Sequence, residues 1–86
     1  MTYLIESPHT QEECLQALDE VSARGPRLLA QFDWGCMAGQ HVGWATVNAG
    51  SESEARNMVA PIVRDKARIV AVNKFTPSQI ESFHKM

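Results

Sequence analysis

The chain of 86 residues is long enough for one small domain, which we take to span residues 1–86. Its net charge is −2, and its eight Lys and Arg side chains form no run, which argues against nucleic-acid and membrane-surface partners. No apolar stretch reaches the roughly 20 residues of a spanning helix, and the first residues lack a signal-peptide pattern. We therefore expect a cytoplasmic protein whose Cys14 and Cys36 are reduced thiols.

The first quarter of the chain predicts a strand followed by a helix. Residues 2–7 alternate in the manner of a half-buried strand. Thr10 and Glu13 have the spacing of a capping box, so a helix is expected to begin there. Gly25 and Pro26 together predict its end, because Gly accepts a left-handed cap and Pro cannot continue a helix.

Residues 28–48 predict a β-hairpin with its turn near residues 38–39. Side chains alternate between the two faces of a strand, so this turn fixes which residues share a face. On one face the expected pairs are Cys36 with His41, Trp34 with Gly43, Phe32 with Ala45 and Ala30 with Val47. On the other face they are Asp33 with Trp44, Gln31 with Thr46 and Leu29 with Asn48.

The second half of the chain predicts a helix, a strand and a last helix. Ser51 and Glu54 form a second capping-box pattern, and Pro61 is expected to end that helix near residue 60. Residues 67–74 are rich in β-branched side chains and predict a strand. Thr76, followed by Pro77, predicts the start of a short final helix.

This β-α-β-β-α-β order predicts an α+β domain in which a four-stranded antiparallel sheet carries two helices on one face. The order, Pro61 before the last strand and the short helix after it together resemble the ferredoxin-like dimeric α/β-barrel superfamily of small bacterial proteins. The resemblance implies a dimer. That superfamily includes cofactor-free monooxygenases, lactone isomerases, haem-related enzymes and metal-binding proteins. The resemblance therefore does not identify a reaction.

The predicted core lies between the sheet and the helices. It comprises Leu18, Val21, Phe32, Trp34, Ala45, Val47, Met58 and Val59. Helices are expected to cover only this side, which leaves the opposite face of the sheet without a cover.

The uncovered face is the first candidate site. It mixes apolar and polar side chains, as a ligand-lined cavity between two facing sheets of a homodimer would. The candidate ligand-binding residues are Glu6, Gln31, Asp33, Trp44, Thr46 and Asn48. Glu6 or Asp33 is the candidate acid or base, and His41 the candidate proton shuttle. The alternative is that this face binds no ligand and is only a dimer interface or a solvated sheet face.

The second candidate site is Cys36 with His41. An imidazole next to a thiol can activate a nucleophile, and the pair could also supply two metal ligands. His9 and Cys14 would add to such a site only if the fold brought them near. The chain lacks CxxC, HxH and HExxH motifs, so we expect neither a stoichiometric metal nor a cofactor.

Three functions follow as hypotheses. The first is a homodimer that binds a small molecule, with a cofactor-free monooxygenase- or isomerase-like activity as one form of it. The second is a metal-binding or metal-responsive protein that uses Cys36, His41 and His9. The third is a structural or regulatory dimerisation module. The sequence does not decide whether the protein is an enzyme.

Overall fold

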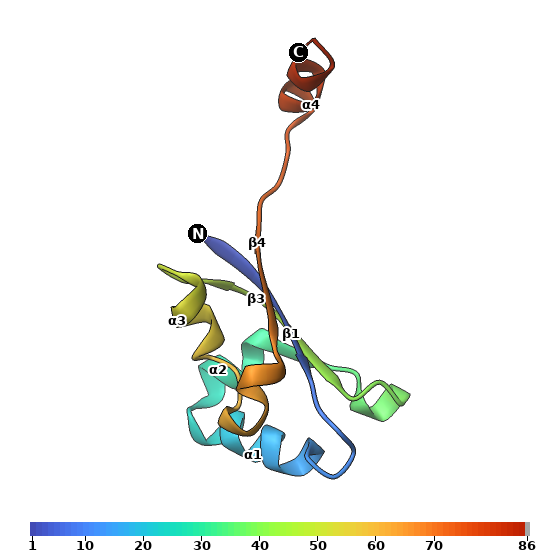
Figure 1. Ribbon diagram of the computed structural model, residues 1–86, viewed down its shortest axis with the longest axis vertical. Coiled ribbons are helices and arrows are strands. Elements are labelled where there is room, and N and C mark those ends of the chain that lie inside the picture. The colour runs from blue at the N-terminus through green and yellow to red at the C-terminus, as the bar shows by residue number, and fades with distance from the viewer. Residues whose placement is uncertain (86) are drawn as a thin grey trace.

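The computed structural model describes residues 1–85 and has an α+β architecture (Figure 1). Its strands are β1 (Thr2–Pro8), β2 (Phe32–Trp34), β3 (Val42–Asn48) and β4 (Arg68–Val72). Its helices are α1 (Cys14–Ala23), α2 (Pro26–Gln31), α3 (Glu52–Arg56) and α4 (Pro77–His84), with 3-10 segments η1 (Cys36–Ala38) and η2 (Pro61–Lys66). All strand pairs are antiparallel, in the sheet order β2-β3-β1-β4.

The inner part of the predicted hairpin is confirmed. Phe32 pairs with Ala45, Asp33 with Trp44 and Trp34 with Gly43. Gly43 is required here because a Cβ atom at that position would lie 2.9 Å from the Trp34 ring. The predicted register is therefore correct across the whole length of β2.

The outer part of the predicted hairpin is wrong. Residues 28–31 belong to α2, so the expected pairs of Ala30, Gln31 and Leu29 with β3 do not form. The reason lies at Gly25 and Pro26: Gly25 takes a φ of 114°, and Pro26 then occupies the first turn of a new helix. Proline thus starts the second helix as well as ending the first.

The turn of the hairpin also differs from the expectation. Cys36 lies in η1 and is not a cross-strand partner of His41. The Gly35 carbonyl accepts hydrogen bonds from the amides of Ala38 and Gln40, which curl the chain into this wider turn. A Cβ atom on Gly35 would lie 2.7 Å from the Gln40 carbonyl oxygen, so the turn depends on glycine.

The predicted helix starts are confirmed with one change. Thr10 and Glu13 form both capping-box hydrogen bonds, at 2.9 and 3.2 Å, although regular α1 begins only at Cys14. Ser51 accepts from the Glu54 amide, while the Glu54 carboxylate accepts from Gly50, one residue earlier than a full box. α3 ends at Arg56, before the expected residue 60.

The core forms on the helix-covered side of the sheet, as expected. Phe32, Ala45, Val47, Val21 and Val59 are buried there, and Trp34 and Met58 pack against them. Leu18 is only half-buried and lies outside this cluster. The sequence reading missed the other buried members, which are Tyr3, Ile5, Ala17, Ala55, Ala60, Val63 and Ala67.

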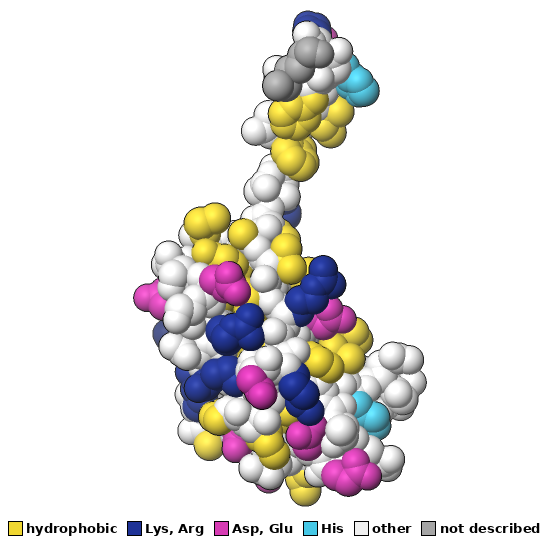
Figure 2. Space-filling model, in the orientation of Figure 1, with side chains coloured by type: hydrophobic (Ala, Val, Ile, Leu, Met, Phe, Trp, Pro, Cys, Tyr) yellow, Lys and Arg dark blue, Asp and Glu magenta, His cyan; other side chains and the backbone are white. Residues whose placement is uncertain are grey.

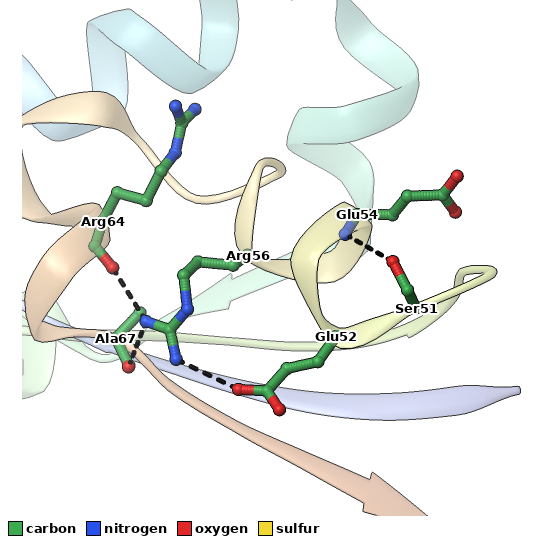
Figure 3. A network of polar contacts seen from close by, with 6 residues as sticks. All are labelled: Ser51, Glu52, Glu54, Arg56, Arg64 and Ala67. Carbon is green, nitrogen blue, oxygen red and sulfur yellow. Dashed lines mark hydrogen bonds and ion pairs between the residues drawn. The ribbon is translucent and has the colours of Figure 1, made fainter.

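A polar network fixes the segment that leads into β4 (Figure 3). The Arg56 guanidinium donates to the carbonyl oxygens of Ala67 at 2.9 Å and Arg64 at 3.1 Å, and it pairs with Glu52 at 3.4 Å. These bonds satisfy the Ala67 carbonyl and give a second donor to the Arg64 carbonyl, which also accepts from the Ala67 amide at 3.3 Å. Arg56 therefore joins α3 to the start of the last strand.

Two features of the surface stand out. Among residues 1–85, no helix covers one face of the sheet, which we call the open face. Its residues include Leu4, Glu6, Asp33, Trp44, Thr46, Asn48, Arg68, Val70 and Val72. Residues 73–85, which we call the arm, extend from β4 away from the body and carry α4 at their end (Figure 1). Within residues 1–85, no helix is long and apolar enough to cross a membrane.

Candidate metal centre

Four side chains from separate segments meet at one end of the sheet: His9, Cys14, Cys36 and His41. Pairing of β1 with β3 places Pro8 opposite Val42, so the residues just beyond those strand ends become neighbours. The His9 amide accordingly donates to the His41 carbonyl at 3.0 Å. The register of one strand pair therefore brings the two histidines together across 32 positions of sequence.

The two cysteines reach the same place from turns. Cys36 is the first residue of η1, in the turn that joins β2 to β3. Cys14 is the first residue of α1, and the capping box of Thr10 and Glu13 holds the preceding turn in a fixed shape. Each ligand is thus positioned by a local feature that the sequence specifies, but their meeting depends on the whole fold.

The functional atoms of the four side chains all lie within 4.8 Å of one another. Within this cluster, His9 Nε2 lies 3.3 Å from Cys36 Sγ. In a tetrahedral zinc site, bond lengths of about 2.0–2.3 Å place the ligand atoms about 3.2–3.8 Å apart. The span of 4.8 Å therefore exceeds the spacing around a bound ion by about 1 Å.

Burial separates this cluster from a chance grouping on the surface. His9 is only 7% exposed, and the other three residues are half-buried. The ring of His9 lies 5.6 Å from that of His41 and 6.0 Å from that of Trp34, measured between centroids. Trp34 in turn stacks on the core residue Phe32. The cluster therefore has an apolar wall on one side.

Two ring nitrogens in the cluster lack a hydrogen-bond partner. Among the buried side-chain nitrogens and oxygens of residues 1–85, the unsatisfied atoms are His9 Nδ1, His41 Nδ1 and Trp34 Nε1. Leaving a buried polar atom without a partner costs about 1–3 kcal/mol, so such atoms usually have a structural reason. Two of the three belong to side chains that could bind a cation.

The charge states of the side chains also bear on metal binding. Burial, and next the neighbouring His41, hold the pKa of His9 below its ordinary value of 6.5. His9 is therefore neutral near pH 7, the form in which imidazole binds metals. Burial, followed by a hydrogen bond with Cys14, raises the pKa of the Cys36 thiol.

The raised pKa of Cys36 weakens the interpretation of this residue as an activated nucleophile. A reactive cysteine needs a lowered pKa, usually from an adjacent cationic group. The imidazole in contact with Cys36 is that of His9, and burial keeps this ring neutral. A bound divalent cation would instead supply the positive charge that converts thiols to thiolates.

A charged pair borders the cluster next to Cys14. The Glu13 carboxylate accepts a hydrogen bond from Lys66 Nζ at 2.6 Å. This bond, together with the Thr10 amide, lowers the pKa of Glu13 to about 2. The Glu13 carboxylate is thus already bound by Thr10 and Lys66. The candidate ligands of the cluster are therefore the four Cys and His side chains.

The sequence-predicted residues of the open face lie elsewhere. Trp44 is half-buried and pairs with both Glu6 and Asp33 on its two neighbouring strands. Thr46 pairs with Leu4 on the same face. A single chain shows no pocket within residues 1–85.

Three of the remaining assignments change. Gln31 lies in α2, where its amide approaches the Arg27 carbonyl, so it does not belong to the open face. Glu6 lies 3.8 Å from Arg68, so a cation accompanies this carboxylate. His41 joins the metal-ligand cluster and does not meet Glu6 or Asp33. Asn48, as expected, lies on the open face and accepts from Thr2 at 3.1 Å.

Comparisons with protein-family models, with curated proteins and with solved structures gave no match to this chain. The chemistry and geometry of the side chains are therefore the basis for any functional assignment.

Proposed function

We propose that this protein binds one divalent transition-metal ion through His9, Cys14, Cys36 and His41. The observation that carries the proposal is the convergence of four ligand atoms within 4.8 Å at a half-buried position. It replaces our sequence-based expectation that no metal is bound, which rested on the lack of a short-range ligand motif. The ligands here come from four segments that only the tertiary structure brings together.

The ligand types favour zinc. Two thiolates and two imidazoles form the Cys₂His₂ set of structural zinc sites, and tetrahedral S₂N₂ geometry is typical of that ion. A site closed by four protein ligands leaves no open position for a substrate, so it favours a structural or metal-responsive role over hydrolytic catalysis. Half-burial of three ligands leaves a route by which the ion can exchange.

A titration of the reduced, metal-free chain with Co²⁺ tests this proposal, because thiolate coordination gives absorption bands that free Co²⁺ lacks. We expect saturation at one ion per chain and displacement of the bands by Zn²⁺. Cys14→Ser, Cys36→Ser, His9→Gln and His41→Gln should each weaken binding. His84→Gln is the matched control, because His84 lies on the arm, outside the cluster. Weak binding without thiolate bands would contradict the proposal.

A second function is supported by the open face. There the half-buried indole of Trp44 lies between the carboxylates of Glu6 and Asp33, with Thr46 and Asn48 beyond. We propose that this surface, within a homodimer, binds a small molecule that is aromatic and polar or that carries few carboxylate groups. Exposed acidic side chains disfavour anionic ligands. Quenching of Trp44 fluorescence by metabolite extracts, absent in Trp44→Phe, would support it. A response that survives this substitution would count against it.

The finer fold assignment and the location are likewise proposals. The sheet order β2-β3-β1-β4, with helices on one face, is compatible with a ferredoxin-like domain and with its assembly into a dimeric α/β barrel. A cytoplasmic location would keep Cys14 and Cys36 reduced, as metal binding requires. An experimental structure of the assembly would test the first, and localisation of a tagged chain the second.

A further inference from the structure

The arm carries a helix, α4, that the sequence specifies locally but that no part of the body covers within residues 1–85. Thr76 and Gln79 form a complete capping box, with bonds of 2.8 and 3.2 Å, and Pro77 follows at the first helical position. Yet every described residue of the arm is exposed. A helix of eight residues is marginal in water without packing, because nucleation is costly. Packing against another surface would therefore stabilise the arm.

The arm also carries an apolar surface. Ile80 and Phe83 are one turn apart on the same side of α4, and they are 47% and 52% exposed. Phe75 lies in the linker between β4 and α4, residues 73–76, and its ring meets that of Phe83 edge to face, with ring centroids 5.4 Å apart. Figure 2 shows these hydrophobic side chains gathered at the far end of the molecule, separated from the body. Such a cluster, held in one shape, is suited to bind an apolar surface.

The body carries an apolar patch on the β1–β4 half of the open face, at the end nearer the arm, while the Glu6–Arg68 ion pair lies at the other end of that half. Leu4 of β1 pairs with Val70 of β4, and both are exposed. Val72 lies beside them, opposite Thr2. The other half of the open face, on β2 and β3, is polar around Trp44. The apolar patch also lies on β4, the strand from which the arm emerges.

The direction of the arm points to a second copy of the chain. β4 continues into the extended linker, residues 73–76, so α4 is carried beyond the end of its own sheet (Figure 1). The molecule is consequently 51 Å long but only 28 and 22 Å across. To reach its own Leu4 and Val70, the chain would have to reverse within the linker, which is instead extended. A neighbouring copy can be reached without any reversal.

We propose that α4 docks on the Leu4–Val70 half of the open face of a second copy, and that two copies exchange arms reciprocally. Exchange makes the interface twofold symmetric, because each chain offers one arm and one face. It also removes the exposed apolar side chains of both surfaces from water. The polar half around Trp44 stays uncovered, so this exchange is an alternative to a barrel of two facing sheets. None of the four metal ligands lies among the docking residues, so the dimer does not depend on the metal site.

Multi-angle light scattering of the full chain over a range of concentrations tests this proposal. The wild type should form a dimer. Phe83→Glu on the arm and Val70→Glu on the face should each weaken it at least about tenfold, because each places a charge in an apolar contact. Ser82→Glu is the matched control: it adds the same charge to the opposite side of α4 and should leave the dimer intact. Circular dichroism confirms that each variant keeps its fold.

Mixing the variants distinguishes exchange from other arrangements. Phe83→Glu retains an intact face and Val70→Glu an intact arm, so their mixture should form heterodimers that neither forms alone. A wild type that stays monomeric at every concentration would overturn the proposal. A mixture that stays monomeric would overturn it too, since an intact arm and an intact face on different chains would then not bind each other. A dimer that resists Phe83→Glu but is lost with Trp44→Glu would overturn it too, because the polar half would be the interface.

Discussion

The metal-ligand cluster and the arm are opposite in how the sequence encodes them. The cluster joins residues from four segments, and His9 and His41 meet only because β1 pairs with β3 in one register. The arm is encoded locally: Thr76, Pro77 and Gln79 specify its helix within a few positions. The cluster exists only when the whole chain has folded, and three of its four residues are half-buried. The arm forms its helix from neighbouring residues, and each of its described residues is exposed. The metal-ligand cluster depends on tertiary structure and the arm depends on local sequence. The two regions should therefore respond differently to mutation.

The largest difference should appear when one aromatic ring is removed from each region. Phe32 is 5% exposed in the core beside the cluster, so Phe32→Ala should lower the free energy of unfolding by about 3–5 kcal/mol. Phe83→Ala on the arm should change it little at concentrations where the chain is monomeric, because within residues 1–85 the aromatic ring that meets Phe83 is Phe75 of the same exposed arm. Urea denaturation of both variants makes the measurement. Equal decreases in the free energy of unfolding of the two variants would contradict the proposed difference between the two regions.

Zinc should stabilise the body by the next largest amount. At a free concentration of 100 times the dissociation constant, a ligand specific to the folded state adds about 2.7 kcal/mol to the free energy of unfolding. Thermal denaturation with and without Zn²⁺ should show a corresponding rise in Tm for the wild type and for a chain that ends at residue 74. Cys36→Ser should lose this rise. A rise that depended on the arm would contradict the proposed ligand set.

A smaller effect is expected from pH in the metal-free chain. The pKa of His9 in the folded chain lies below the ordinary 6.5 because of burial and of the nearby His41. The unfolded chain therefore binds this proton more tightly, and stability should decrease as the pH falls below 6.5. His9→Gln should flatten the pH dependence of the urea midpoint there, whereas His84→Gln should not. A midpoint that rose as the pH fell would contradict this assignment.

The smallest effect should come from the cap of α4. Thr76→Ala removes the hydroxyl that accepts from the Gln79 amide, which should cost about 1 kcal/mol of local helix stability. Amide hydrogen exchange of residues 77–84 should accelerate, while the urea midpoint of the monomeric chain stays unchanged. Ser78→Ala, which removes a hydroxyl without touching the cap, is the control. A shifted midpoint would show that α4 contributes to the stability of the body.

The contrast also explains what the sequence could predict. Local signals gave the helix starts at Thr10, Ser51 and Thr76, and alternation gave the register of Phe32 with Ala45. The extent of the hairpin was wrong because Gly25 and Pro26 serve two helices at once. The full ligand set could be named only on the condition that the fold brought His9 and Cys14 near, because nothing near Cys14 in sequence shows that its side chain will meet Cys36. That information lies in the order of the strands.

The most direct test of the metal centre is native mass spectrometry of the reduced chain with Zn²⁺. We predict one zinc per chain, with a mass increase equal to that of the ion less two protons, because coordination deprotonates Cys14 and Cys36. The Cys14→Ser and Cys36→Ser variants should lose this species under the same conditions, and His84→Gln should keep it. A chain that remains metal-free, or zinc adducts that persist in both cysteine variants, would contradict the account.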